Sequence, residues 1–527
     1  MQALKMTPTG GGDMKILLRG VASRVGVRVG IRLAGRVLMA ASVVLSTALA
    51  LGMLSPFPAC CDAAPKRFDG VEITVGVMAA PAIGSPAKAH ALTWENATGG
   101  KVRIVEYPFD MLFEKFMEGL TSKEPVFDVI FFAPQWAGDF FEYLAELPDD
   151  LLPDESLDDI LPIYRDRLMK WEGKTISVTV DGDLYTGYYR KDLFEDARNR
   201  ADFKARFGYD LGPPETWRRY RDVASFFNGR KGPDGRILSG ATEPFAVGSQ
   251  EFGDIFSRAA VYTNPPDAVG GQFFSPDTMK AQINNPGWQR AIQDYVEILK
   301  YCPAGSLDYG ILETRRAFVR GDAALTLDWG DTGQLAVDPA KSAVVGKVGC
   351  FVLPGANAAW DYKRGVWENH ERPHRVSFLA FGGWVGGVPK NSKRRNAAWD
   401  FILWYGSPEN SLHDVVSSDT GINPYRYSHF TNIDAWTKSY PRSFAMEYLD
   451  VVRISLESPH VALDLRLPGA NEYVTALERQ VRRVLTEGAS VEDALDLAAA
   501  DWEKITDRLG RSRQLSIYRA SMGLPPK

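Results

Sequence analysis

Between residues 71 and 132 the spacing of hydrophobic positions alternates between two patterns. Three short runs rich in β-branched and aromatic residues predict strands: Val71–Val77, Lys101–Glu106 and Phe127–Phe132. The two segments between them, 86–98 and Asp110–Leu120, predict helices, because their apolar residues recur at helical spacing. Strands that alternate with helices need crossover connections and favour a largely parallel sheet.

The same alternation resumes after residue 180. The strand-like runs are Tyr185–Tyr189, Ala323–Leu327 and Val376–Phe381, and the helical segments are Thr216–Phe227, Trp288–Tyr301 and Asn471–Leu509. Two charged stretches, Leu147–Asp159 and Asp361–His374, are typical of exposed loops. A chain of 527 residues exceeds the usual size of one domain, so this pattern predicts an α/β fold of two lobes.

The first 64 residues have the composition of an export signal. A basic region, an uncharged region and small residues follow one another: Lys15 to Arg36, then Val37–Cys61, then Ala63 and Ala64. This order predicts a signal peptide over residues 1–64, cleaved on export to the periplasm, with Met14 as an alternative start. Two other interpretations stay open. Residues 37–57 are long enough for a membrane anchor, and Cys60 is a candidate for lipidation.

Charge and cysteine content narrow the class of protein further. Removal of residues 1–64 leaves 54 basic and 64 acidic residues, a net charge of −10, which argues against a nucleic-acid partner. Cys302 and Cys350 are the two cysteines of the remaining chain. An isolated pair in an exported protein predicts one disulfide, with two buried free thiols as the alternative.

The sequence offers little support for a catalytic or metal centre. GxSxG and CxxC are absent, and Leu168 stands where a phosphate-binding loop ending in Gly173-Lys174-Thr175 needs its first Gly. His370 and His374 have no further His or Cys nearby in sequence to complete a metal site. We therefore expect neither a zinc-peptidase nor a serine-hydrolase centre, no metal and no cofactor.

Four short segments combine an aromatic ring with Gly, Asp or Asn. They are Pro134–Asp139 with Trp136, Asp328–Gly333 with Trp329 and Asp331, Gly382–Gly387 with Trp384, and Thr420–Tyr425 with Asn423 and Tyr425. Flanking glycines leave a ring accessible and let the backbone approach a ligand. An aromatic face suits the apolar face of a sugar ring, and acidic and amide side chains bind its hydroxyls. A single Trp of this kind more often packs in a core, but four such segments predict a carbohydrate-type site.

Five longer segments occur in a characteristic order. They are Phe127–Phe140 (FDVIFFAPQWAGDF), Val180–Phe194 (VDGDLYTGYYRKDLF), Pro213–Tyr220 (PPETWRRY), Ala317–Gly333 (AFVRGDAALTLDWGDTG) and Ala397–Ser407 (AAWDFILWYGS). With them, residues 68–510 resemble the extracellular solute-binding proteins of ABC importers, in the sugar-binding family that includes maltose-binding protein. The resemblance implies a non-enzymatic, monomeric receptor that closes on its ligand and docks on permease subunits.

The resemblance also implies a division of the chain and a set of site residues. The expected parts are the signal peptide, a first lobe of residues 65–181 and 352–405, a second lobe of residues 182–351 and 406–510, a tail of residues 511–527, and a hinge near Asp181–Asp183. The implied ligand-binding residues are Trp136, Asp183, Trp329, Asp331, Trp384, Asn423, Tyr425, Arg466 and Tyr473. The Asp361–His374 insertion and the long region Asn410–Ser443 depart from the family pattern.

Other ligands and another class of protein stay open. The same fold could bind glycerol phosphate, a polyamine or a peptide. A cluster of Arg in the cleft would favour phosphate, and a cluster of carboxylates with aromatic rings would favour a polyamine. An exported glycoside hydrolase is the remaining alternative, and it would need two carboxylates about 5–10 Å apart across a cleft.

Overall fold

The computed structural model describes residues 66–79, 81–151, 154–266, 270–417 and 420–525. Its α-helices are α1 (Gly84–Thr98), α2 (Phe109–Thr121), α3 (Ala137–Phe140), α4 (Asp154–Asp158), α5 (Lys191–Glu195), α6 (Ala197–Phe207), α7 (Trp217–Phe227), α8 (Phe252–Thr263), α9 (Pro286–Ile298), α10 (Ile311–Val319), α11 (Gly330–Val337), α12 (Arg395–Tyr405), α13 (Pro408–Val415), α14 (Tyr427–Thr431), α15 (Ile433–Trp436), α16 (Arg442–Leu456), α17 (Ala470–Glu487), α18 (Val491–Leu509) and α19 (Arg511–Ser521). Its strands are β1 (Glu72–Met78), β2 (Lys101–Tyr107), β3 (Val129–Phe132), β4 (Lys170–Trp171), β5 (Lys174–Thr175), β6 (Val178–Thr179), β7 (Thr186–Arg190), β8 (Ser239–Thr242), β9 (Ala323–Asp328), β10 (Val348–Phe351), β11 (Ala356–Asp361), β12 (Val366–His374), β13 (Ser377–Leu379), β14 (Val385–Gly387) and β15 (Val461–Leu463).

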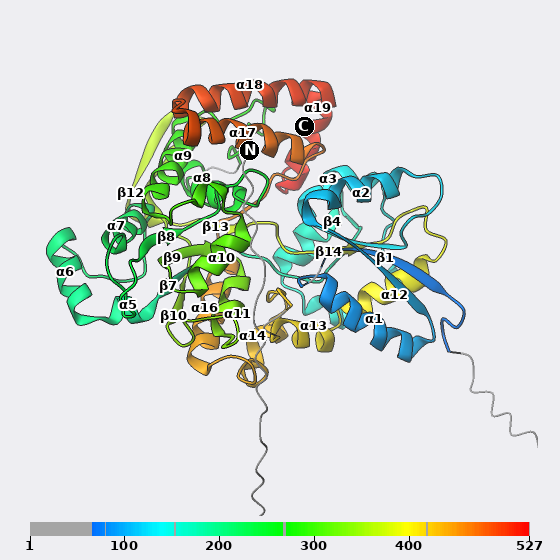
Figure 1. Cartoon of the computed structure of the whole chain (residues 1–527). Coiled ribbons are helices and arrows are strands. Elements are labelled where there is room, and N and C mark those ends of the chain that lie inside the picture. The colour runs from blue at the N-terminus through cyan, green and yellow to red at the C-terminus, as the bar shows by residue number, and fades with distance from the viewer. Residues whose placement is uncertain (1–65, 80, 152–153, 267–269, 418–419, 526–527) are drawn as a thin grey trace, which may run out of the picture. The chain divides into compact units, whose positions relative to one another are not determined.

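The first large sheet has five strands in the order β2-β1-β3-β14-β6. β1 is parallel to β2 and β3, whereas β14 is antiparallel to β3 and β6. Because β1 lies between β2 and β3, the crossovers through α1 and α2 run in opposite directions. Right-handed crossovers then put α1 and α2 on opposite faces of the sheet. Figure 1 shows this arrangement, with α12 packed beside α1.

The second large sheet has four strands in the order β10-β7-β9-β8. β7 is antiparallel to both of its neighbours, and β8 is parallel to β9. Every residue of the central strands β7 and β9 is buried, because helices such as α10 and α11 cover the sheet. This explains why Ala323–Leu327 is an apolar run in the sequence rather than an alternating one.

The chain passes between the two sheets more than once. It leaves the first sheet after β6 and enters the second at β7, and it returns from β10 to β14. The run Val376–Phe381, which we expected to belong to the first lobe, contributes β13, and β13 pairs only with β15 among the described strands. The residues that join the first sheet are those after Trp384, namely β14.

The stretch Asp361–His374, predicted to be an exposed loop, belongs to a β-hairpin. β11 and β12 pair antiparallel, with Trp360 opposite Trp367, and the hairpin packs against α8 and α9. Residues 352–405, expected in the first lobe, therefore divide between this hairpin and the first sheet. The exact lobe boundaries stay a prediction.

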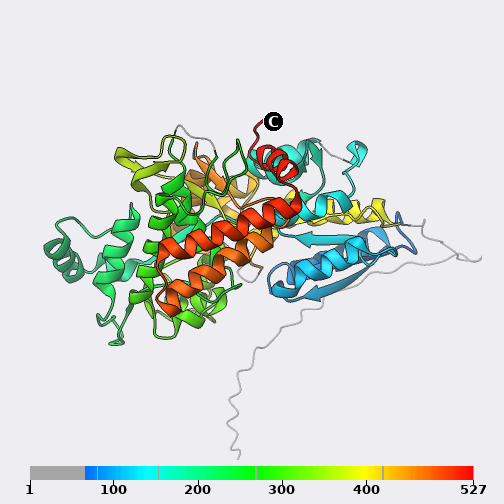
Figure 2. The ribbon, with the colours of Figure 1, turned by 90° about the horizontal axis from the view of Figure 1, so that it is seen from above.

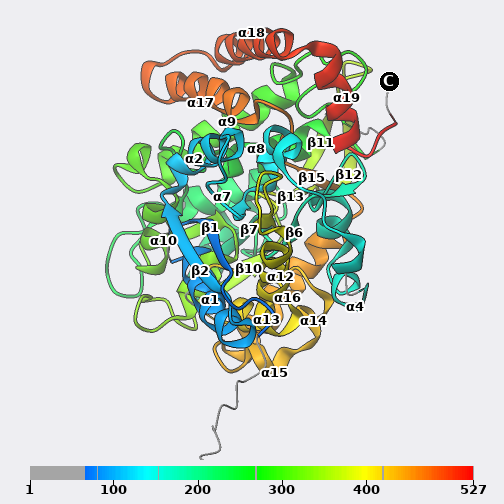
Figure 3. The ribbon, with the colours of Figure 1, turned by 90° about the vertical axis from the view of Figure 1, so that its right-hand side faces the viewer.

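The C-terminal part is helical, as its periodicity predicted. The region Asn471–Leu509 forms two helices, α17 and α18, because Gly488 adopts a left-handed conformation with φ +71° and ends the first. Figures 2 and 3 show the two helices side by side. Trp502 of α18 is fully buried and stacks on Phe274 at 4.9 Å between ring centroids. The expected tail contains a further helix, α19.

In the part of the chain that the structure describes, none of the helices combines the length and the apolar character needed to span a bilayer. The signal peptide, the alternative anchor over 37–57 and the lipidation of Cys60 concern residues outside the described ones.

Candidate ligand-binding cleft

A cleft of about 980 Å³ lies between loops that follow or precede strands of the two large sheets. Small-molecule sites of proteins commonly have volumes of about 300–1,000 Å³, so this one suits an oligosaccharide as well as a single ring. Its acidic and aromatic lining residues are Asp110, Asp181, Asp183, Glu313, Asp331, Phe109, Trp329, Phe381 and Trp384.

The carboxyl end of β9 delivers the first group of side chains. β9 ends at Asp328, Trp329 follows as the N-cap of α11, and Asp331 lies in the first turn of that helix. Strand ends of α/β sheets are where ligands usually bind, because the connecting loops meet there. The strand therefore positions Trp329 and Asp331 at the cleft.

Arg315 of α10 organises the carboxylates at this strand end. Its guanidinium binds Asp328 with two hydrogen bonds, of 2.7 and 3.0 Å, and donates a third to Asp331 at 2.9 Å. Asp328 is fully buried and also accepts a hydrogen bond from the Thr332 hydroxyl. A bidentate pair of this kind holds both groups rigidly. The geometry leaves Asp331, the more exposed partner, available to a ligand.

The crossover after β6 supplies two further carboxylates. Asp181 accepts a hydrogen bond from the backbone N–H of Asn423 at 2.6 Å, and Asp183 accepts one from its side-chain amide at 2.7 Å. Burial raises the pKa of both carboxyls well above the usual range, and the charge of Asp331 adds to this effect. Asn423 thus links the late loop to both acidic residues from behind the cleft.

Phe381 is the centre of the aromatic surface. Its ring lies within 6.0 Å of the rings of Phe109, Phe252, Trp329 and Trp384. It is one of few non-glycine residues in a left-handed conformation, with φ +66°, and its backbone N–H donates to Asp464. Such a conformation is costly unless its surroundings hold it, which is common where side chains must point into a site.

The glycines beside Trp384 and Trp329 serve a different purpose from the one expected. A Cβ on Gly383 would lie 1.8 Å from the Asp181 carbonyl oxygen, and one on Gly330 would lie 1.8 Å from the Asn423 side chain. The glycines therefore permit close approach of crossing segments, and they do not leave open space around the rings. The expectation that they keep the rings accessible is wrong.

Four of the nine predicted ligand-binding residues line the cleft: Asp183, Trp329, Asp331 and Trp384. Trp329 follows a strand of the second sheet and Trp384 precedes a strand of the first. Both rings are largely packed, with 3% and 5% of their surface exposed. A fifth residue, Asn423, is buried and contacts the cleft carboxylates instead of lining the cleft.

Two further predicted residues, Trp136 and Arg466, do not line the cleft. The Trp136 indole N–H donates to Asn471 at the start of α17, and its ring stacks on Phe109. Arg466 donates to the backbone carbonyls of Pro134 and Arg167. These contacts join the loop after β3 to the segment that precedes α17, so Trp136 and Arg466 hold the fold together there.

Tyr473 and Tyr425 are fully buried and do not line the cleft. The Tyr473 hydroxyl shares a hydrogen bond with Thr506, and its ring packs on Trp502. The Tyr425 ring packs on His429. These two tyrosines are therefore not part of the proposed site.

Sequence reasoning missed Arg315, Asp181 and Phe381. Asp181 lies two residues before the predicted Asp183, and the repeated acidic pattern was a usable signal. Arg315 and Phe381 gave no such signal in the sequence. An Arg inside a helix looks like an ordinary surface residue, and a Phe after a strand looks like an ordinary core residue.

One sequence motif bears on the expectation that the chain has no zinc-peptidase centre. Residues 370–374 read His-Glu-Arg-Pro-His, which is the HExxH spacing of zinc peptidases, so the chain does contain this pattern. The motif works on a helix, where both His share a face, whereas here it lies on β12 and contains Pro373. Within the described residues no group of His, Cys, Asp or Glu side chains is arranged to hold a metal ion.

The predicted disulfide is absent, since Cys302 and Cys350 are free. Cys350 lies on β10, and Cys302 follows a 3₁₀ turn (Leu299–Tyr301) that packs on β8. β10 and β8 are the two edges of one sheet, so three strand spacings of about 4.8 Å separate them. That exceeds the roughly 7 Å between Cα atoms that a disulfide allows.

The two-lobe arrangement and its cleft are those of the periplasmic binding proteins among the solved structures. Comparison with known proteins then gives the family. Residues 91–445 match the bacterial extracellular solute-binding protein family, and the chain belongs to it. It is an ABC transporter substrate-binding protein, which confirms both the predicted fold class and the resemblance found in the sequence. Members of this extracellular or periplasmic family work with the permease subunits of ABC transporters.

Individual relatives are distant in sequence. The probable amino-acid ABC transporter periplasmic-binding protein y4oP of Sinorhizobium fredii is 24% identical over 364 residues, 66% of this chain and 71% of the relative. An Agrobacterium radiobacter solute-binding protein in complex with ribitol has a TM-score of 0.66 at 22% identity and covers 84% of this chain and 100% of its own. Maltose-bound MalE3 of T. maritima has a TM-score of 0.63 at 21% identity, covering 82% and 100%.

Proposed function

We propose that this receptor binds a sugar, an oligosaccharide or a polyol in the cleft and delivers it to its permease. The observation that carries the proposal is the meeting of Trp329, Phe381 and Trp384 with Asp183 and Asp331 in one cleft. Aromatic faces stack on sugar rings, while carboxylates accept hydrogen bonds from hydroxyl groups. Ligands named for structural neighbours, ribitol, maltose and D-mannitol, support the same class.

In this proposal the protein performs no chemistry on its ligand. It acts as a monomer in the periplasm, and the lobes close around the solute through the crossover that contains Asp181 and Asp183. The glycoside hydrolase alternative is not carried further, because the family consists of transport receptors.

The test is calorimetric titration with ribitol, D-mannitol and maltose, using wild type and Asp331→Asn. At least one solute should bind saturably, and Asp331→Asn should weaken it about tenfold, since a charged hydrogen-bond acceptor is lost. Asp450→Asn, at an exposed position of α16, is the matched control and should bind as wild type does. Failure of all sugars and polyols in a broad panel would reject the proposal.

A second candidate ligand is a solute that carries an amino group. Asp181, Asp183 and Asp331 line the cleft, and each of its three described cations pairs with a carboxylate: Arg315 with Asp328 and Asp331, Arg316 with Glu313, and Lys341 with Asp338. Carboxylates beside aromatic rings suit an ammonium group, which gains from both. Glycerol phosphate fits less well, because every described cation of the lining already pairs with a carboxylate.

Spermidine and glucosamine, added to the same titrations, distinguish the two candidates. Tighter binding of glucosamine than glucose, or saturable binding of spermidine that weakens with salt, would favour the amine. Equal binding of glucosamine and glucose without any binding of spermidine would favour the neutral polyhydroxylated ligand.

A further inference from the structure

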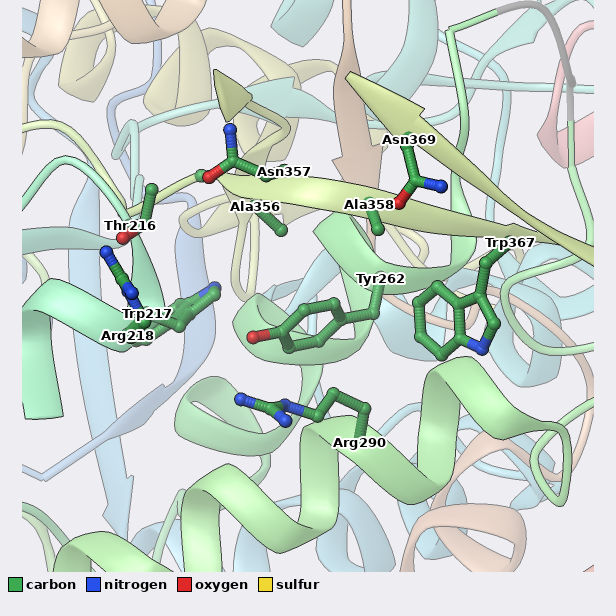
Figure 4. Close-up of a pocket in the computed structure, with 11 residues that line it drawn as sticks. Thr216, Trp217, Arg218, Tyr262, Arg290, Ala356, Asn357, Ala358, Trp367 and Asn369 are labelled. Atoms are coloured by element: carbon green, nitrogen blue, oxygen red, sulfur yellow. The ribbon is translucent and has the colours of Figure 1, made fainter. Parts of the chain in front are cut away.

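A second pocket lies where the β11–β12 hairpin meets α7, α8 and α9 (Figure 4). Its volume is about 340 Å³, roughly a third of that of the cleft, and the two share no lining residue. Tyr262 of α8 and Arg290 of α9 form one side, and Trp217 and Arg218 of α7 stand at one end. Trp367 of β12 closes the other end.

The walls of this pocket are fixed to one another. Gly355, which precedes the hairpin, donates its backbone N–H to the Glu215 carbonyl and accepts from the N–H of Trp217. Thr216 caps α7 by accepting a hydrogen bond from Arg219. The Tyr262 hydroxyl donates to Asp294, which also pairs with Arg290 at 3.2 Å. The pocket is therefore preformed, as binding sites usually are.

All charged side chains that line this pocket are positive. Two of the eleven lining residues, Arg218 and Arg290, are cationic, and none is Asp or Glu. Arg290 is balanced by Asp294 behind it. Arg218 is exposed and has no hydrogen-bond or ion-pair partner among the described residues. An unpaired guanidinium at a pocket mouth favours an anionic group with two acceptor oxygens.

A buried donor and an exposed ring add a second, independent observation. Trp217 is 2% exposed, yet its indole N–H has no acceptor among the described residues, and Figure 4 shows that nitrogen on the side of Tyr262. A buried N–H without an acceptor is costly, so a ligand oxygen there would be stabilising. Trp367, with 37% of its surface exposed, offers a face for a ring, and the Asn369 amide lies on the same strand.

From these features we propose that the pocket is an accessory site for one monosaccharide-sized ring that carries a carboxylate or phosphate. Arg218 binds the anionic group, the Trp217 N–H and the Asn369 amide bind ring oxygens, and Trp367 packs against the ring. Trp367 and Asn369 of the lining belong to the Asp361–His374 insertion, which departs from the family pattern. The site is independent of the ligand assigned to the cleft.

The test titrates the full exported chain with D-glucuronate, glucose 6-phosphate, D-glucose and inorganic phosphate. We expect saturable binding of glucuronate or glucose 6-phosphate and much weaker binding of glucose. The tighter binder of the two shows whether the site prefers a carboxylate or a phosphate. Arg218→Gln should weaken it about tenfold, because a charge-assisted contact is lost. Trp367→Ala should also weaken it while thermal unfolding shows a folded protein.

Two matched variants complete the experiment. Arg219→Gln removes the next cation of α7, which pairs with Glu215 and does not line the pocket, and should leave binding unchanged. Asp331→Asn alters the cleft alone and should also leave this binding unchanged, so failure of the cleft assignment and failure of this site remain distinguishable. Any one of three results would overturn the proposal. Arg219→Gln could weaken binding as much as Arg218→Gln does, inorganic phosphate could bind as tightly as the sugar acids, or no saturable binding could occur at millimolar concentration.

Discussion

Trp329 and Trp384 both line the cleft, but each also has a packing role. The Trp329 indole N–H donates to the Ala380 carbonyl at 2.8 Å, and its ring contacts Tyr185 and Phe381 edge-on. Trp384 contacts Phe109 and Phe381. From the sequence we expected that truncation of either ring would cost less stability than that of a fully buried Trp. The observed packing revises this expectation.

Trp329→Ala and Trp384→Ala should each lower the free energy of unfolding by about 3–5 kcal/mol, the usual cost of removing a packed Trp. The affinity of the folded fraction for its cleft ligand should also fall, by about 1–3 kcal/mol. Urea unfolding and calorimetry measure the two effects separately. Trp399→Ala, at a buried position of α12 outside the cleft lining, is the control for packing alone. Unchanged affinity in both cleft variants would show that the rings only pack the fold.

Glu251 lies directly behind a loop of the cleft. Its carboxylate accepts hydrogen bonds from the backbone N–H groups of Gly248 and Ser249, which line the cleft. Burial raises the pKa of Glu251 to about 7, although these hydrogen bonds and the charge of Arg482 oppose the change. Burial and the charge of Glu251 also raise the pKa of Glu478 on α17.

A carboxyl with a raised pKa in the folded state favours folding when it is protonated. The stabilisation is complete below the unfolded pKa of about 4.5, and it is lost as the pH rises to about 7. The free energy of unfolding should therefore fall between these values, and Glu251→Gln should flatten that slope. Denaturant unfolding at a series of pH values measures it, with Glu124→Gln at an 86% exposed side chain as the control. A slope that Glu251→Gln leaves intact would assign the pH dependence to other groups.

At the scale of elements, two connecting segments cross next to the cleft and are bonded to each other there. The Trp384 carbonyl accepts a hydrogen bond from the N–H of Val180 at 2.9 Å, which joins the segment before β14 to the crossover after β6. Gly383, with φ +90°, lies against the Asp181 carbonyl at this crossing. Only glycine combines this conformation with so close an approach.

Gly383→Ala should destabilise the protein by about 3 kcal/mol or more, because the added Cβ meets backbone atoms that cannot move aside. Gly365→Ala is the matched control. Its φ is +66°, but a Cβ there meets nothing within 4 Å, so only the conformational cost of about 1–2 kcal/mol applies. Thermal or denaturant unfolding compares the two. Equal losses would mean that the crossing tolerates displacement.

The elements themselves were largely predictable. The predicted strand Lys101–Glu106 corresponds to β2, and the predicted strand Phe127–Phe132 contains β3, which begins two residues later. Thr216–Phe227 matches α7 with Thr216 as its cap. These signals are local in sequence. The hairpin β11–β12 was missed because its strands are polar and partly exposed, so they lack an apolar stripe. A strand that pairs mainly with its own hairpin partner leaves little hydrophobic pattern to detect.

For the whole molecule, we expect the ligand to shift a population of open and closed forms. Only a closed form contacts the solute from the side of Trp329 and from that of Trp384 at once, so the ligand binds that form more tightly. The radius of gyration from X-ray scattering should decrease on saturation with a tight cleft ligand. At a ligand concentration that just saturates the wild type, Asp331→Asn, which we expect to bind about tenfold more weakly, should show a smaller decrease. An unchanged radius of gyration in the saturated wild type would contradict closure.

The sequence by itself determined the α/β class, most strands and helices, the family, and the residues at strand ends. Each of these depends on local periodicity or on motifs in a fixed order, which the chain carries whatever its final packing. Only the tertiary structure decided which aromatic segments reach the cleft. Trp136 and Tyr473 have the same local chemistry as Trp329, but contacts between distant segments bury them in the fold instead. The tertiary structure also decided that the two cysteines stay free, because the order of strands in the second sheet keeps them apart. In the same way it brought Arg315 next to Asp328 and Asp331, an ion-pair cluster that the sequence does not reveal.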